Sequence, residues 1–166
     1  MLGDNVRYDA EVKHYPDLVE FLIEHFELIS VCPEVEIGLS VPRPPVKLVQ
    51  TSTSSIPDEI KMVGRDDPSI EVTQAMRNFC QQRPPQLDSI HGYIFKSKSP
   101  SCGIKNVPLF NEQGVESGLT RGVFVSAILQ FYPLLPITDE SGLQTNQQFE
   151  NFLQQVINYK NHPDHA

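Results

Sequence analysis

Residues 90–103 read Ile90-His91-Gly92-Tyr93-Ile94-Phe95-Lys96-Ser97-Lys98-Ser99-Pro100-Ser101-Cys102-Gly103. The first six residues include β-branched and aromatic side chains, which predicts a strand over 90–95. Lysine, serine and proline follow, as is typical of a loop, and a cysteine stands near the end of this loop. The stretch therefore predicts a strand that delivers the Cys102 thiol to the edge of a sheet.

A second cysteine has the same place relative to an earlier apolar run. Leu28-Ile29-Ser30-Val31 predicts a short buried strand, and Cys32-Pro33-Glu34 follows it directly. In open α/β sheets, ligands bind at the edge formed by the carboxyl ends of the strands. We therefore expect Cys32 and Cys102 to lie beside one pocket, as ligands or as nucleophiles.

The rest of the chain alternates between helical and extended patterns. Apolar residues recur at helical spacing in the segments 17–26, 68–82, 119–131 and 146–159. Further strands are predicted at 46–50 and 134–137, with a turn at 110–114 and a stiff extended stretch at Pro42-Arg43-Pro44-Pro45.

This alternation favours the α/β class. The specific prediction is a Rossmann-like three-layer sandwich with a mainly parallel sheet and helices on both faces. Because the chain opens at 1–9 in a sequence typical of a loop, the prediction leaves room for a missing first strand.

Composition narrows the classes of function. The 166 residues suffice for one domain with a sizeable core, and the formal net charge is -8. An acidic balance disfavours strong unaided binding to a phosphate backbone, which depends on Lys and Arg displacing counterions. Residues 41–105 differ, with nine basic and six acidic residues. They indicate either a solvated surface of mixed charge or a local site for an anionic ligand.

Cysteine usage and hydropathy predict a compartment. Three cysteines without a CxxC pair, and no secretory signal pattern, favour a reducing cytoplasm. No apolar stretch approaches the roughly 20 residues needed to cross a bilayer, so no membrane partner is expected. Cys80 lies on the predicted helix 68–82 and is expected to be a small buried hydrophobe.

Four blocks follow one another along the chain: Leu2-Gly3-Asp4-Asn5-Val6-Arg7-Tyr8-Asp9, Cys32-Pro33-Glu34-Val35-Glu36-Ile37-Gly38-Leu39, Val41-Pro42-Arg43-Pro44-Pro45 and Lys96-Ser97-Lys98-Ser99-Pro100-Ser101-Cys102-Gly103. Together they resemble the thiouracil desulfurase (TudS-like) family, over about residues 2–140. The resemblance implies a desulfurase domain at 1–140. Residues 141–166 form a predicted C-terminal helix that resembles the junction to a second domain in longer members. Such fused proteins include desulfidases acting on 4-thiouridine in tRNA.

The resemblance also implies a cofactor, a 4Fe-4S cluster held by three cysteine thiolates with one iron left open. Cys32 and Cys102 match two of these ligands, and the third would fall just before Met1. Thiolates are soft ligands that suit iron–sulfur centres, and thiocarbonyl sulfur is soft as well. The open iron would bind that sulfur, polarise the C=S bond and accept sulfide.

Residues near the two cysteines receive roles from the same resemblance. Glu34 is the predicted base that activates water, with Asp9 as second choice, and Ser101 is a predicted donor to a substrate oxygen or cluster sulfur. The residues expected to orient the pyrimidine or its phosphate are Lys96, Ser97 and Arg43. Simpler interpretations stay open: a surface or capping carboxylate, a turn serine, and solvated side chains.

The sequence thus predicts a cytoplasmic iron–sulfur enzyme that converts a thiolated pyrimidine to the oxo base with release of sulfide. Its expected partner is either thiouracil, as a free base, or thiolated tRNA. One alternative is a non-enzymatic module that binds a modified base or a partner protein and lacks a complete cluster site. A weaker alternative is a cysteine hydrolase with Cys102 as nucleophile.

Overall fold

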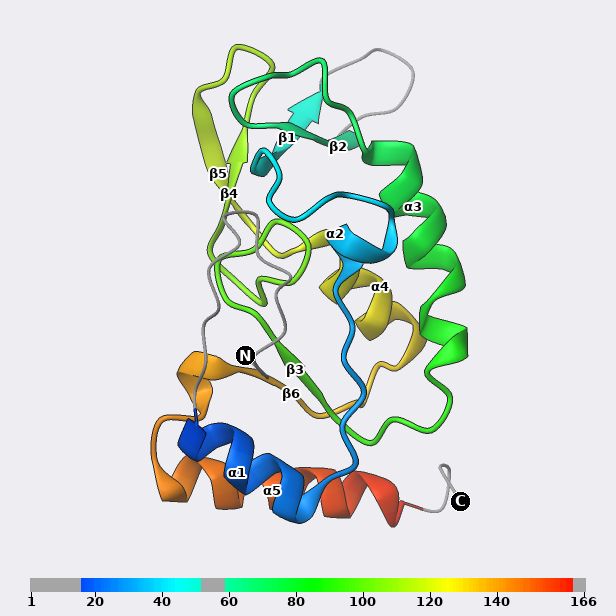
Figure 1. Cartoon of the computed structure of the whole chain (residues 1–166), viewed down its shortest axis with the longest axis vertical. Coiled ribbons are helices and arrows are strands. Elements are labelled where there is room, and N and C mark those ends of the chain that lie inside the picture. Colours follow the sequence, from blue (N-terminus) through cyan, green and yellow to red (C-terminus); the bar gives the residue numbers. More distant parts are fainter. Residues whose placement is uncertain (1–15, 52–58, 163–166) are drawn as a thin grey trace.

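The computed structural model describes residues 16–51 and 59–162. In chain order its elements are α1 (Pro16–His25), α2 (Pro33–Glu36), β1 (Val46–Thr51), β2 (Glu59–Gly64), α3 (Thr73–Gln82), η1 (Pro84–Gln86), β3 (Tyr93–Phe95), β4 (Val107–Phe110), β5 (Glu116–Thr120), α4 (Val123–Phe131), β6 (Ile137–Asp139), η2 (Glu140–Gly142) and α5 (Asn146–Lys160). Figure 1 shows a four-stranded sheet at one end of the long axis, a two-stranded sheet in the middle, and α1 beside α5 at the other end.

The larger sheet has the strand order β2-β1-β4-β5 and mixed direction. β1 pairs antiparallel with β2, from Val46 opposite Gly64 to Thr51 opposite Glu59. β1 is parallel to β4, and β4 forms an antiparallel hairpin with β5. A separate sheet pairs β3 with β6 in parallel, with Phe95 opposite Asp139.

The α/β class is therefore confirmed, but the expected mainly parallel sheet is wrong. Only one pair of the four-stranded sheet is parallel, and the described strands do not show a Rossmann-like three-layer sandwich. Parallel neighbours need a crossover of about a dozen residues or more. The connections at 52–58 and 111–115 are shorter than that, so β2 and β5 fold back as antiparallel strands. Neither strand, nor β4, was predicted from the sequence.

Helical periodicity located α1 and α5 closely. α5 begins with a capping box, in which the Thr145 hydroxyl accepts from the Gln148 N–H at 3.3 Å and Gln148 Oε1 accepts from the Thr145 N–H at 3.1 Å. Such a cap satisfies two amide donors that have no partner inside the helix. Residues close together in sequence thus determine where α5 begins, and the helical spacing predicted the same start.

Two other helices begin later than expected, because residues predicted to lie in their first turns pair with strands instead. α3 starts at Thr73 instead of 68, since Glu71 bridges to Val63 of β2 and the Val72 N–H donates to Met62 O. α4 starts at Val123 instead of 119, because Leu119 is paired in β5.

The strand predicted at 28–31 is also wrong. This segment is extended chain between α1 and α2 and belongs to neither described sheet. Ile29 is 54% exposed, so the run lacks the two buried faces of a central strand. Leu28 and Val31 pack against core clusters instead. The strand predicted at 90–95 is shortened to Tyr93–Phe95, and that at 134–137 shifts to Ile137–Asp139.

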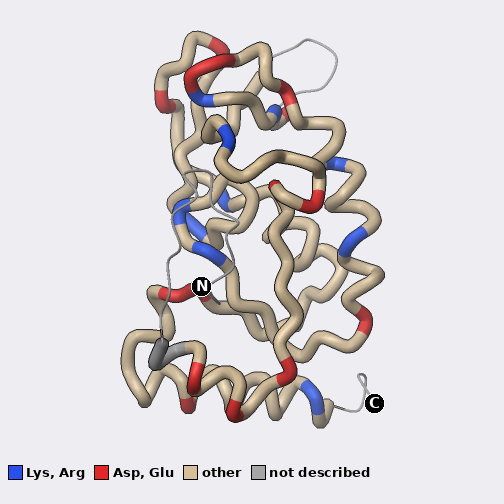
Figure 2. Tube along the Cα trace, viewed as in Figure 1, with Lys and Arg blue, Asp and Glu red and all other residues tan. Residues whose placement is uncertain are grey.

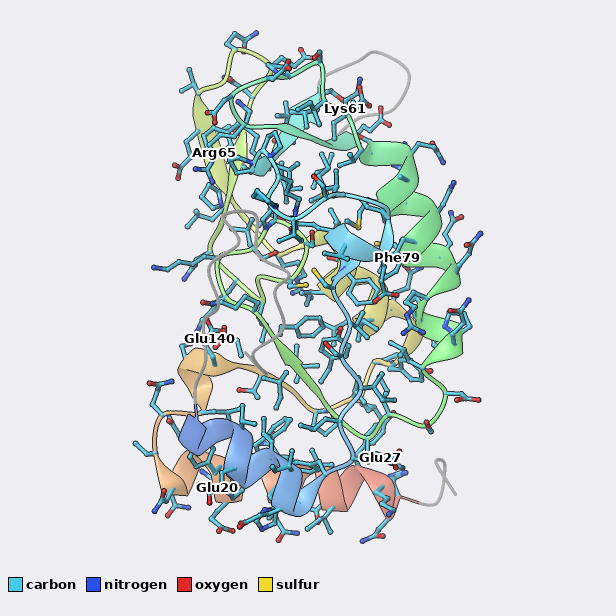
Figure 3. All side chains as sticks on the ribbon, in the orientation of Figure 1. Glu20, Glu27, Lys61, Arg65, Phe79 and Glu140 are labelled. Carbon is cyan, nitrogen blue, oxygen red and sulfur yellow. The ribbon has the colours of Figure 1, made fainter. Side chains whose placement is uncertain are left out.

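Three apolar clusters form the core. The cluster between α1 and α5 contains Leu22, Leu143, Phe149, Phe152 and Val156. The middle cluster contains Leu87, Phe95, Phe124, Val125, Ile128 and Leu135. The third lies against the larger sheet and contains Val46, Leu48, Met62, Met76 and Val107. Phe79 of α3 joins the last two through a ring contact with Phe124, and Figure 3 shows its position.

The described helices are all too short or too polar to cross a bilayer. Charge is unevenly distributed over the fold. Figure 2 shows Asp and Glu on α1, and Lys and Arg around the loop between β3 and β4. Of the basic residues at 41–105, Lys96, Lys98 and Lys105 thus lie on the loop that carries Cys102, whereas Arg77 lies on α3.

Candidate active site

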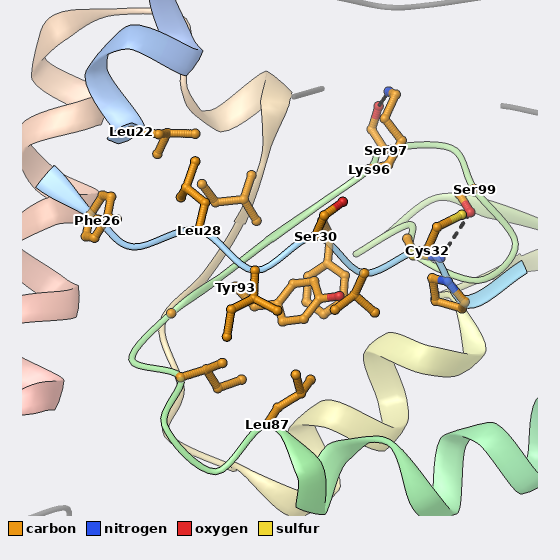
Figure 4. Close-up of a pocket in the computed structure, with 18 of the residues that line it drawn as sticks. Leu22, Phe26, Leu28, Ser30, Cys32, Leu87, Tyr93, Lys96, Ser97 and Ser99 are labelled. Carbon is orange, nitrogen blue, oxygen red and sulfur yellow. Dashed lines mark hydrogen bonds between the residues drawn. The ribbon is translucent and has the colours of Figure 1, made fainter. Parts of the chain in front are cut away.

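A pocket of about 1200 Å³ opens where the three core clusters meet. Figure 4 shows its apolar end at Leu22, Phe26 and Leu28 and its polar end at Cys32, Lys96, Ser97 and Ser99. Both Cys32 and Cys102 line this pocket, together with Glu34 and Arg43. The structure thus brings together the residues of three separate sequence blocks.

Cys32 occupies the N-cap position of the four-residue helix α2 without a capping hydrogen bond from its side chain. Pro33 takes the first helical position, where a missing N–H costs nothing. The Cys32 N–H donates to Glu36 Oε1 at 3.3 Å, and Glu36 Oε2 pairs with Arg83 Nε at 3.0 Å. Arg83 follows α3, so this chain of contacts ties the backbone of Cys32 to a long helix.

Cys102 is fixed by a compact loop. The Ser99 hydroxyl accepts from the N–H groups of Ser101 and Cys102, at 3.2 and 3.1 Å, and the Gly103 N–H donates to Ser99 O at 2.8 Å. The dashed line in Figure 4 marks the contact of Ser99 with the Cys102 N–H. The loop also caps α4: Gly122 N donates to Gly103 O at 2.7 Å, Val123 N to Pro100 O at 3.2 Å, and Phe124 N to Ser101 O at 3.0 Å.

Replacing Gly122 with alanine is expected to displace this loop. Gly122 has an ordinary φ of -62°, so the cost is steric: an added Cβ would lie 2.4 Å from Ser101 O and 2.7 Å from Cys102 N. Backbone atoms cannot rotate away, so we expect a loss of about 1–3 kcal/mol in stability and a displaced Cys102. Gly118→Ala is the matched control, because nothing lies within 4 Å of its Cβ. Urea unfolding of both variants measures the difference, and equal stabilities would contradict the expectation.

Two side chains hold Glu34 at the polar end of the pocket through three hydrogen bonds. Its Oε2 accepts from Arg43 Nε at 3.1 Å and Nη2 at 2.8 Å, and its Oε1 accepts from the Ser101 hydroxyl at 3.0 Å. The side chains of Arg43 and Glu34 are 4% and 12% exposed. Ser101 is fully buried and is not among the residues lining the pocket. The Ser101 hydroxyl therefore donates its hydrogen bond directly to the Glu34 carboxylate.

Lys96 and Ser97 line the pocket and share one buried partner, Glu140. Glu140 accepts from Lys96 Nζ, from the Ser97 N–H at 2.9 Å and from the Ser97 hydroxyl at 2.6 Å. Burial alone would raise the pKa of Glu140, but these hydrogen bonds outweigh it and the pKa lies below its ordinary value. Glu140 is therefore a buried carboxylate behind the pocket wall.

The surroundings of the Cys102 thiol disfavour its charged form. Burial raises the pKa of the Cys102 thiol, and the charges of Glu34 and Cys32 raise it further. Burial also raises the pKa of Tyr93, with Cys102 and Cys32 contributing. A catalytic thiolate nucleophile needs a lowered pKa, so this environment does not favour a cysteine hydrolase. Cys80 packs against two core clusters, and burial raises its pKa to about 11.

The sequence did not point to two residues of the site, Ser99 and Glu140. Asp9, the second choice for the base, lies outside the described residues. Ser99 was missed as an organiser of its loop, although its neighbours Pro100 and Cys102 could have drawn attention to it. Glu140 was missed because nothing local distinguishes it: it lies 44 residues from Lys96 along the chain.

The donor set fits two ligand positions of an iron–sulfur cluster, because Cys32 and Cys102 offer soft sulfur to one pocket. In residues 16–51 and 59–162 no three Cys, His, Asp or Glu side chains gather as metal ligands. Among these residues, the cysteines that line the pocket are Cys32 and Cys102.

The fold and pocket define an α/β protein in which two cysteines lie beside a buried, arginine-paired carboxylate. The sequence profile of the 2-thiouracil desulfurase family matches residues 1–140, and the chain belongs to this enzyme family. The resemblance seen in the sequence is thus confirmed. The solved structure of TudS, titled a 4Fe-4S-dependent thiouracil desulfidase, has a similar fold: the TM-score is 0.59, with 23% identity over 86% of this chain and 87% of that chain. A comparison with curated proteins gave no significant match.

Proposed function

We propose that this chain removes sulfur from a thiolated pyrimidine, giving the oxo base and sulfide, with a 4Fe-4S cluster as cofactor. Membership of the desulfurase family supports the reaction class. The observation that carries the proposal is the convergence of Cys32, Cys102 and Glu34 on one pocket, with Glu34 held by Arg43 and Ser101.

In this proposal Cys32 and Cys102 hold the cluster through their thiolate sulfurs. When bound, the cluster supplies a soft Lewis acid that polarises a C=S bond. The backbone contacts of both cysteines, to Glu36 and to Ser99, fix where their sulfurs can reach. Fixed ligands favour one cluster position over many, which a catalytic metal site requires.

Glu34 acts as the base that accepts a proton from the attacking water. A carboxylate has about four acceptor positions, and the two N–H groups of Arg43 and the hydroxyl of Ser101 occupy three of them. The fourth has only a long contact, 3.5 Å, with the Ser99 hydroxyl. A water molecule can compete for that position on Oε1, where Glu34 lines the pocket.

The substrate is a thiolated pyrimidine, as a free base or within RNA. Arg65 and Lys98 line the pocket and are exposed, so they can meet a phosphate at the pocket opening. Lys96 and Ser97 lie nearer the polar end and can contact the ring. These positions favour a substrate that carries a phosphate beyond the reacting ring.

Anaerobic reconstitution with iron and sulfide, followed by incubation with thiouracil or a short 4-thiouridine RNA, tests this function. We expect broad visible absorption from the cluster and sulfide release matched by loss of the thiobase spectrum. The same assay on a version extended upstream of Met1 examines the third ligand expected there. Binding of either compound without sulfide release would indicate a binding module, and absence of iron in both versions would contradict the enzyme.

A further inference from the structure

We propose that Glu140 determines the charge selectivity of the pocket: by neutralising Lys96, it makes the polar end suit an uncharged pyrimidine ring over a negatively charged one. The inference rests on the proposed function, because it concerns the ring that would react there. Glu140 lies outside the sequence blocks that contain Cys32 and Cys102, so the inference assigns part of the substrate specificity to a residue beyond those blocks.

The β3–β6 sheet brings Glu140 to Lys96. Phe95 pairs with Asp139, so the next residues of both strands, Lys96 and Glu140, leave the sheet side by side. Glu140 is 6% exposed and does not line the pocket itself. Figure 3 shows Glu140 in η2, beside the chain that follows β3. It therefore acts on a ligand only through Lys96 and Ser97.

Hydrogen bonds fix the orientation of the Lys96 ammonium. One N–H group meets Glu140, and a second faces the Ser97 hydroxyl, 3.4 Å from Nζ. An ammonium has three N–H groups, so one remains for a ligand in the pocket. Lys96 can thus donate one hydrogen bond to a ring oxygen, while the carboxylate of Glu140 compensates its positive charge.

The second cation near the polar end is neutralised in the same way. Arg43 pairs with Glu34, so both cations with restricted solvent access have a carboxylate partner. Arg65 and Lys98 have no ion-pair partner among the described residues, but both are exposed and screened by water. An anionic ring would meet the carboxylate of Glu140 behind Lys96, and like charges close together disfavour binding.

Equilibrium binding to the Glu140→Gln variant tests this inference. The two probes are 2-thiouracil and its 6-carboxy derivative, which adds one negative charge to the same ring. Wild-type chain is expected to prefer the neutral probe. The variant is expected to shift the ratio of the two dissociation constants about tenfold toward the anionic probe, because one cation within a few ångströms loses its partner. Isothermal titration calorimetry at neutral pH measures both constants without any turnover.

Two further variants separate charge from structural damage. Glu150→Gln makes the same change at an exposed position of α5 and is expected to leave the ratio unchanged. Lys96→Met combined with Glu140→Gln removes both charges and is expected to return the ratio toward the wild-type value. A merely structural role of Glu140 would not be corrected by a second substitution. Melting temperatures of all variants check that they fold.

The outcomes distinguish the two proposals. If wild-type chain binds neither probe, the proposed substrate class is contradicted. If it binds the neutral probe but Glu140→Gln shows no shift in the ratio, or the double variant keeps the shift, only the role of Glu140 is overturned.

Discussion

Replacing Cys32 or Cys102 with serine is expected to remove most of the iron that the chain takes up on anaerobic reconstitution. A serine oxygen is a hard, weakly acidic donor that does not replace a thiolate in an iron–sulfur site. Both residues line the pocket, and the charge of Cys32 contributes to the raised pKa of Cys102. Iron and acid-labile sulfide per chain, with the visible absorption of the cluster, measure the effect.

Cys80→Ser is the matched control, since it removes the remaining cysteine by the same chemical change. Cys80 lies on α3 among apolar side chains and is not among the residues lining the pocket. We expect iron uptake to stay near the wild-type value. Loss of iron in Cys80→Ser equal to that in Cys102→Ser would show that the ligand assignment is wrong, as would full iron uptake in Cys32→Ser.

Glu34→Gln is expected to lower sulfide release about 10²- to 10⁴-fold while iron content stays unchanged. That range is typical for loss of a general base, and glutamine cannot accept the proton. The amide can still accept from Ser101, so the loop of Cys102 keeps its hydrogen bond. Sulfide release per cluster, not per chain, is the quantity to compare. Glu112→Gln, at the exposed turn between β4 and β5, is the control with the same chemical change.

Glu34→Gln also removes the carboxylate that pairs with the buried guanidinium of Arg43, so it is expected to lower stability as well. Breaking a buried pair on one side costs about 3–5 kcal/mol. Glu34→Asp keeps the charge and withdraws the carboxylate by one methylene, so it is expected to fold well and still lose most of its turnover. Unchanged rates in both Glu34 variants would move the base to another residue, with Asp9 as the remaining choice from the sequence.

Local sequence determines more about the loops of the candidate site than about the pairing of strands in the sheet. The blocks around Cys32 and Cys102 carry their own turns, caps and prolines, so their loops form from neighbouring residues. The strand at 28–31 failed because its four apolar residues have the same pattern in a strand and in an extended segment packed on the core. Strand direction failed because it depends on which segments pair, and pairing is a property of the whole fold.

The sequence by itself determined the helices α1 and α5, the cysteine loops and the family, because helical period, capping residues and short motifs act over a few residues. Only the tertiary structure decided that Glu34 is held by Arg43 and Ser101 and that Glu140 lies behind Lys96. These contacts join residues 9, 67 and 44 positions apart, and they form only after strands and helices have packed. Burial then strengthens them, since water no longer competes for the charges.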